Sequence, residues 1–211
     1  PSPMKAFPAM WRTFKVLYDE LFLWVWLSVL WWAGTLLILP AGPVAAGLHA
    51  AANRAANYKR VDSDFFWDAA KGQIGRSWLM VGTSLLLHVA VILNIAFYAN
   101  SAASWARFVT ILWLWVIVLL MMGGQYFLPL FWQQEDPSLR LLIRNAFILA
   151  LQHPLYTLLM LIFQITLIVV SFVTVLPIFL LMPASVAVAA NVGLVVLLED
   201  KGLAPPPPPG V

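Results

Sequence analysis

The sequence contains no cysteine, which excludes a disulfide framework, a thiolate nucleophile and a Cys-ligated zinc or iron–sulfur site. Charge is also scarce, because only 10% of the 211 residues are charged, whereas a soluble domain has about a quarter. No phosphate-binding glycine loop, H-E-x-x-H or G-x-S-x-G pattern occurs, and no acidic residue lies within a long apolar run. We therefore expect neither an enzyme nor a carboxylate-based proton or cation relay.

Apolar residues make up 63% of the chain, and several runs reach the roughly 20 residues that a membrane-crossing helix needs. These features predict an all-α integral membrane protein, with a single polytopic membrane domain over residues 1–198 and a proline-rich cytoplasmic tail over 199–211. In so apolar a chain, the net charge of +3 indicates cytoplasmic membrane edges and not a nucleic-acid partner.

The long apolar runs are Leu21–Leu39, Leu79–Ala99, Ala106–Phe131 and Pro154–Leu198. The first is too long for a signal-peptide core, so we expect a retained helix. The last is broken at Pro177 and Pro183 and should fold back near Pro183 as two helices. Two amphipathic patches, 58–78 and 133–153, predict cytoplasmic-side helices. Gly123, Gly124 and Gln125 predict a close contact or kink in the fourth helix.

The stretch 43–57 decides the topology. If it crosses the membrane, the chain has six crossings with both termini on one side, and eleven of the twelve basic residues share that side. Those eleven are Lys5, Arg12, Lys15, Arg54, Lys59, Arg60, Lys71, Arg76, Arg140, Arg144 and Lys201. Only Arg107 falls opposite. If 43–57 does not cross, the split is 4 inside to 8 outside, so the positive-inside rule favours six crossings with cytoplasmic termini. A re-entrant helix is the alternative.

Small residues recur every four positions in this stretch, at Gly42, Ala46 and Ala50 and again at Gly47, Ala51 and Ala55. That spacing lets helix backbones approach closely, so we predict a short helix enclosed by protein. The segment "LILPAGPVAAG" (37–47) is similar to "LLMPASVAVAA" (180–190). This similarity is either a weak internal repeat or a chance match between two Ala/Val-rich segments.

Four polar residues within the predicted spans are candidates for a polar intramembrane site. His49, Asn53 and Asn57 form one stripe at i, i+4 and i+8, and His88 lies near the middle of the third span. The stripe indicates either a polar cavity or hydrogen bonds that fix helix packing. Haem or chlorin ligation by His49 or His88 is a further alternative. Their predicted depths of ~9 Å and ~16 Å below the outer helix ends do not suit a ligand pair. No cofactor or metal is therefore predicted.

The order of a first span, "LPAGPVAAGL", a basic stretch and "DSDFFWDAAKGQIGRSW" resembles the YesL-like family of small bacterial integral membrane proteins. The matching positions are Gly42, Pro43, Ala45, Ala46, Asp64, Phe65 and Phe66. The chain has Leu39-Pro40-Ala41 where the family often has a Thr before the Gly-Pro. The resemblance covers about residues 15–100. It implies a bacterial inner-membrane protein associated with carbohydrate uptake, without catalytic residues to assign.

The sequence therefore favours a non-catalytic accessory or assembly subunit of a larger membrane complex, with the bilayer and other membrane subunits as partners. The family resemblance adds a carbohydrate-uptake permease as the partner class. A small stand-alone transporter or channel using the polar residues is the alternative. A pigment- or haem-binding subunit of an energy-transducing complex is a third.

Overall fold

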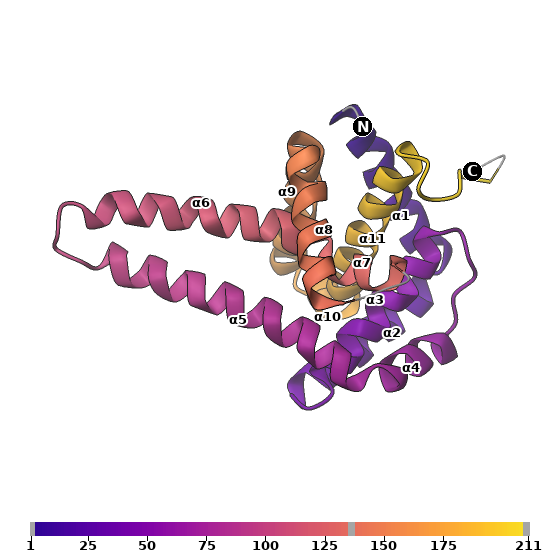
Figure 1. The fold of residues 1–211 in the computed structure, drawn as a ribbon. Helices are drawn as coiled ribbons and strands as arrows, with labels where there is room; N and C mark the ends of the chain where they lie inside the picture. The colour runs from indigo at the N-terminus through magenta and orange to yellow at the C-terminus, as the bar shows by residue number, and fades with distance from the viewer. Residues whose placement is uncertain (1–2, 135–137, 209–211) are drawn as a thin grey trace.

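The computed structural model of the protein describes residues 3–134 and 138–208, and within these ranges the fold is helical, without strands. Part of the second amphipathic patch and the end of the proline run lie outside the described residues. The helices are η1 (Pro3–Lys5), α1 (Ala6–Asp19), α2 (Leu21–Leu36), α3 (Ala41–Ala56), α4 (Ser63–Gly72), α5 (Ile74–Ala99), α6 (Ala106–Gly124), α7 (Phe127–Gln133), α8 (Leu139–Gln152), α9 (Pro154–Thr174), α10 (Leu176–Leu180) and α11 (Met182–Asp200). The two ends of the described chain lie on the same side of the body (Figure 1).

Helices α3 and α11 form the centre of the body. Twelve of the 16 residues of α3 and fourteen of the 19 residues of α11 are buried. Small residues allow this, since a Cβ at Gly47 would lie 2.8 Å from the Phe66 carbonyl oxygen, and one at Gly34 only 2.6 Å from Val44 Cγ1. The predicted enclosed helix is confirmed. The two similar segments, 37–47 and 180–190, thus contribute the two central helices.

Helix α1 packs along α11 and is bent by 92° from α2. Its buried side is formed by Ala6, Ala9, Thr13 and Leu17, which are spaced as one helical face. The first apolar helix ends at Leu36, three residues earlier than the predicted span. The reason is that Ile38 adopts a positive φ of 63°, a left-handed conformation that turns the chain toward α3.

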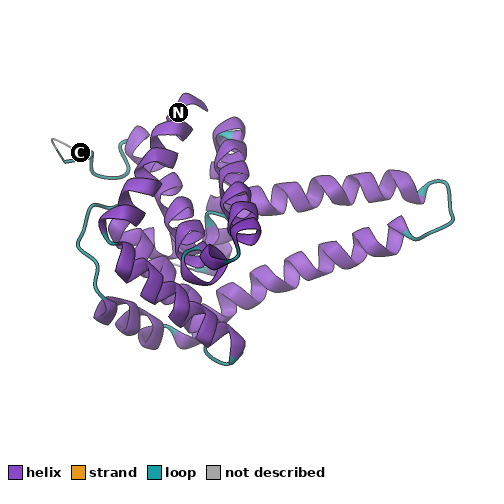
Figure 2. Ribbon diagram, turned by 180° about the vertical axis from the view of Figure 1, so that it is seen from behind, coloured by secondary structure: helices purple, strands orange, loops and turns teal. Residues whose placement is uncertain are grey.

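Helices α5 and α6 form a long hairpin that projects away from the rest of the molecule (Figures 1 and 2). Only 11% of the most apolar stretch of α5 and 17% of that of α6–α7 are buried. The predicted fourth span is interrupted, because α6 ends at Gly124 and α7 begins at Phe127. The close contact predicted there is confirmed, as a Cβ at Gly123 would lie 2.9 Å from Phe147 Cε1 of α8.

The two amphipathic patches form α4 and α8, which pack on protein. Asp62 caps α4 by accepting a hydrogen bond from the Phe65 N–H at 2.8 Å. Phe66 is fully buried beside Gly47, so it does not lie in a lipid headgroup layer as the exposed face of a surface helix would. Helix α8 buries Leu142, Ala146, Leu149 and Ala150.

The last apolar run folds back near the predicted place. Helix α9 ends at Thr174, and Val175 then takes a left-handed conformation with φ of 60°. Pro177 and Pro183 follow in the first turns of α10 and α11. Proline is tolerated there because a backbone N–H in the first turn has no hydrogen-bond acceptor within the helix. Helix α11 continues to Asp200, two residues past the boundary predicted for the cytoplasmic tail.

Within the described residues, four helices are long and apolar enough to cross a membrane, namely α5, the pair α6–α7 taken together, α9 and α11, and the bent pair α1–α2 would make a fifth. Helix α3, with 16 residues, is not among them. The hairpin runs across the direction of α9 in both views, so these candidate spans do not share one axis. The length and composition of these helices are compatible with a multi-pass membrane protein, but they do not establish the count of six crossings.

Candidate functional site: polar side chains between the helices

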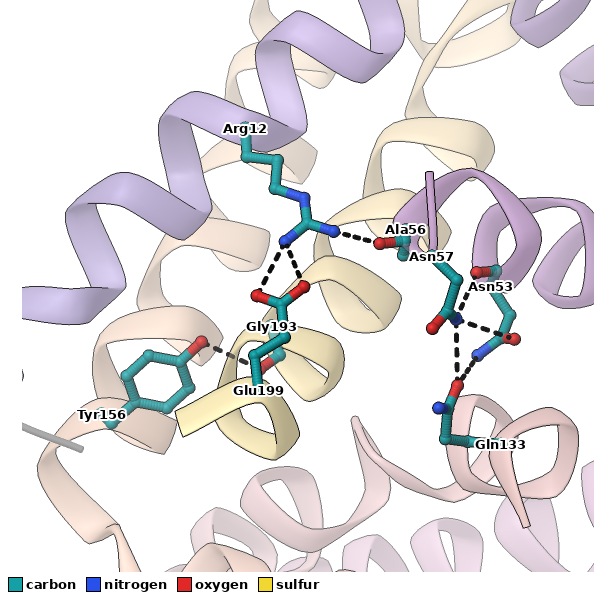
Figure 3. Close-up of polar contacts among 8 residues, drawn as sticks. All are labelled: Arg12, Asn53, Ala56, Asn57, Gln133, Tyr156, Gly193 and Glu199. Atoms are coloured by element: carbon teal, nitrogen blue, oxygen red, sulfur yellow. Dashed lines mark hydrogen bonds and ion pairs between the residues drawn. The ribbon is translucent and has the colours of Figure 1, made fainter. Parts of the chain in front are cut away.

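An amide cluster joins the end of α3 to α7. Asn53 and Asn57 both donate side-chain N–H groups to Gln133 Oε1, each at 3.0 Å, as Figure 3 shows. Asn57 also donates to the Asn53 carbonyl oxygen at 2.8 Å. Two members of the predicted stripe thus bond to a neighbouring helix. These contacts support the interpretation that the stripe fixes helix packing.

His49, the third member of the stripe, is paired with Asn191 of α11. Asn191 Nδ2 lies 3.1 Å from His49 Nδ1 and donates to the Ala187 carbonyl oxygen at 2.8 Å. A carbonyl oxygen only accepts hydrogen bonds, so the amide nitrogen of Asn191 must face it. His49 Nδ1 is therefore the acceptor and the ring proton is on Nε2, which leaves no free nitrogen lone pair for a metal. Asn191 is a buried partner that the sequence analysis missed, although an Asn within an Ala/Val-rich run was its signal.

A charged clasp connects α1, α3 and α11 at the end of the body where the termini lie. Arg12 Nη1 lies 3.1 Å from both carboxylate oxygens of Glu199, and Nη2 donates to the Ala56 carbonyl oxygen (Figure 3). The guanidinium carbon lies 3.9 Å from the Tyr58 ring centre. Burial raises the pKa of Tyr58, and the positive charge of Arg12 opposes that shift. Lys5, the residue just before α1, and Asp200 of α11 add a second, more exposed ion pair.

His88 lies in a different place, at the base of the hairpin. A groove of about 250 Å³ opens there between α5, α6, α9 and α11. Its polar lining is Ser84, His88, Gln125 and Gln164, and Leu161 and Ile165 are part of its apolar wall. We call this the hairpin-base groove. His88 Nδ1 lies 2.7 Å from the carbonyl oxygen of Ser84, one turn earlier on α5.

Two glutamines of this groove form a chain of hydrogen bonds with backbone carbonyl groups. Gln164 Nε2 donates to Gln125 Oε1 at 2.8 Å, and Gln125 Nε2 donates to the Thr157 carbonyl oxygen at 3.1 Å. Nearby, Tyr126 and Thr157 share a hydroxyl–hydroxyl bond of 3.1 Å. From the sequence, Gln125 was considered only as part of a close contact or kink, and Gln164 was not considered. The presence of a glutamine inside the most apolar span could have indicated Gln164.

The four residues predicted as one polar intramembrane site therefore lie in three separate surroundings. His49 and His88 have different partners and do not form a pair of ligands. No group of three or more His, Cys, Asp or Glu within the described ranges is arranged to hold a metal ion. The predicted site is thus divided: His49, Asn53 and Asn57 bond to α7 and α11, and only His88 lines the hairpin-base groove.

The residues that carry the family resemblance come together in space. Gly42, Pro43, Ala45 and Ala46 are buried in α3, while Asp64, Phe65 and Phe66 belong to α4. The two helices pack on one another, with Phe66 against Gly47. A Cβ at Gly42 would lie 3.1 Å from Trp78 Cγ. The Gly-Pro-Ala-rich segment and the acidic-Phe-Phe segment therefore pack together as one unit.

Comparison with known proteins found no match to a protein family, a curated protein or a solved structure. Function must therefore be inferred from the arrangement of the chain itself.

Proposed function

We propose that this protein is a non-catalytic accessory or assembly subunit of a larger membrane complex, and that its α5–α6 hairpin is the surface that contacts the partner. The observation that supports this is the contrast in burial within one molecule. In α11, 78% of the most apolar stretch is buried by the protein itself, whereas α5 has 11%. The hairpin leaves the body instead of packing along it (Figure 1).

Two glycines on α5 support a protein partner over lipid alone. Gly75 and Gly82 are seven residues apart, so they lie on one face of the helix. A Cβ at either position would meet no atom within 4 Å. Glycine inside a helix costs about 1 kcal/mol relative to alanine, and no close packing against the described residues compensates for that cost at these two positions. Close packing of a helix from another subunit against this face would compensate for the cost, because small residues allow such close contacts in membranes.

The resemblance of residues 15–100 to the YesL-like family supports a carbohydrate-uptake permease of the bacterial inner membrane as the partner class. The distribution of basic residues supports the accompanying topology of six crossings with both termini in the cytoplasm. In the fold, Arg107 follows the hairpin turn directly, and so lies at the far end from the charged clasp of Arg12 and Glu199. This separation agrees with placing Arg107 opposite to the other basic residues.

The test is purification of the tagged protein from native membranes in mild detergent, with mass spectrometry of the proteins that accompany it in fixed stoichiometry. Gly82→Leu places a large side chain at a position where an added Cβ meets no atom of the described residues within 4 Å. We expect this variant to fold normally and to lose the stoichiometric partner. Gly82→Ala, which adds only one carbon, is the matched control and retains most of it.

A protein that purifies alone overturns the proposal, and so does a partner whose yield is the same in Gly82→Leu and the parent. A visible absorption spectrum of the same sample tests the pigment-subunit alternative. A solute flux into liposomes containing only this protein would instead support the stand-alone transporter.

A further inference from the structure

The hairpin-base groove contains polar atoms that the accessory-subunit role does not use. Gln164 is only 6% exposed, and His88 is half-buried. Both line the same 250 Å³ hollow, whose remaining wall is mainly aliphatic. For comparison, an apolar cavity of roughly 150 Å³ holds a benzene ring. The groove therefore has room for the head of a small amphiphile.

Backbone carbonyl groups determine which way the two glutamine amides face. Gln125 Nε2 donates to the carbonyl oxygens of Met122 and Thr157, at 3.2 and 3.1 Å. Its Oε1 must then accept from Gln164 Nε2, which also donates to the Met160 carbonyl oxygen at 3.3 Å. Turning either amide over would place oxygen against oxygen. Gln164 Oε1 is left as an acceptor that receives no hydrogen bond from any described residue.

The same reasoning fixes the tautomer of His88. Its Nδ1 faces the Ser84 carbonyl oxygen at 2.7 Å, and that oxygen can only accept, so the ring proton is on Nδ1. In the neutral ring Nε2 is then a bare acceptor, and it too receives no hydrogen bond within the described part of the chain. The groove thus offers two acceptors, Gln164 Oε1 and His88 Nε2, in a hollow whose remaining lining is mainly aliphatic.

We propose that the hairpin-base groove binds the neutral hydroxyl-bearing head of a lipid-soluble molecule, an alcohol or phenol, whose O–H groups donate to Gln164 Oε1 and His88 Nε2. Acceptors select donors, so a ketone or ether of the same shape is rejected. The described residues that line the groove include no acidic side chain, so they offer no counter-charge to a cationic head. The aliphatic wall, which includes Leu161 and Ile165, contacts the apolar part of the ligand.

The test compares 2-naphthol with 2-methoxynaphthalene, which differ in the donor hydroxyl, on the purified full-length protein in lipid nanodiscs. Binding is followed by naphthalene fluorescence and by the ¹⁵N resonances of the three histidines. We expect saturable binding of naphthol, about tenfold tighter than the methyl ether, as the loss of one buried hydrogen bond predicts. Only the Nε2 resonance of His88 shifts on binding.

Three variants locate the site. 2-Naphthol has a single O–H donor, and the expected response assigns it to His88 Nε2, so His88→Phe should weaken naphthol binding about tenfold. Gln164→Met should weaken the binding of 2,3-dihydroxynaphthalene, which has a second O–H to donate, by the same factor. Asn94→Leu removes an exposed polar group elsewhere on α5 that bonds to its own helix, and should leave binding unchanged. Equal binding of the two probes, or no response of the His88 resonance, overturns the proposal. The probe comparison uses the unmutated protein, so it holds even if a variant fails to fold.

Discussion

The charged clasp allows the contribution of a buried ion pair to be compared with that of a more exposed ion pair beside it. Arg12 and Glu199 are each 12% exposed, whereas the side chain of Lys5, in the neighbouring pair with Asp200, is 47% exposed. Glu199→Gln keeps the size and the acceptor oxygen of the side chain but removes the negative charge. Arg12 is then left as a nearly buried cation, held by the Ala56 carbonyl oxygen and the Tyr58 ring.

The magnitude follows from these contacts. Removing one partner of a buried ion pair lowers the free energy of unfolding by roughly 3–5 kcal/mol. Glu199→Gln should lie near the lower end, at about 3 kcal/mol, because Arg12 keeps two of its contacts. Arg12→Met should lie nearer 4 kcal/mol, since Glu199 then loses the one charged partner that it has among the described residues. The double variant Arg12→Met/Glu199→Leu should recover most of the loss, because no charge remains buried.

The assay is equilibrium unfolding of the purified protein in detergent micelles, followed by far-ultraviolet circular dichroism as the mole fraction of SDS rises. Lys5→Met is the control, and its loss should be much smaller because solvent screens the exposed pair. The reasoning is refuted if Lys5→Met loses as much stability as Glu199→Gln. A double variant less stable than either single variant would refute it equally.

Three further outcomes are expected. Gly47→Ala places a Cβ 2.8 Å from the Phe66 carbonyl oxygen and should lower the free energy of unfolding by about 1–3 kcal/mol. Gly82→Ala, where a Cβ meets no described atom within 4 Å, should be neutral or stabilising by up to about 1 kcal/mol. Both values are measured by the same unfolding titration. Gln133→Leu removes the acceptor shared by two asparagines and should cost about 1–3 kcal/mol, and a loss below 0.5 kcal/mol would contradict the amide cluster. Because the chain has no cysteine, single substitutions can report the topology in intact cells. Lys71→Cys should react only with membrane-permeant thiol reagents, whereas Ser104→Cys in the hairpin turn should also react with impermeant reagents. The reverse result would contradict the proposed topology.

Local chemistry along the sequence was enough to predict most of the helices and their breaks. The small residues of α3 predict an enclosed helix because only side chains of that size let backbones approach closely. In the structure, Gly47 of α3 packs against Phe66, and Gly34 of α2 packs against Val44 of α3. The close contact at Gly123 and the fold-back near Pro183 could be predicted for the same reason. Each depends on the conformational limits of one or two residues.

The candidate site was only partly readable. The stripe of His49, Asn53 and Asn57 follows from helical periodicity, but periodicity does not show what faces the stripe. Its partners Gln133 and Asn191 are 76 and 142 residues away from Asn57 and His49. Their roles depend on how α7 and α11 dock. The orientation of Gln164 likewise depends on three backbone carbonyl groups contributed by two helices.

The sequence by itself determined the membrane class, the absence of cysteine chemistry and the positions of the apolar helices, because composition and run length act locally. Only the tertiary structure decided that α1 bends away from α2, that α3 and α11 become the core and that α5–α6 projects as a hairpin. Apolar periodicity is satisfied equally by lipid and by protein. The choice between them is made by which helices fit closely, and that is a property of the packed molecule.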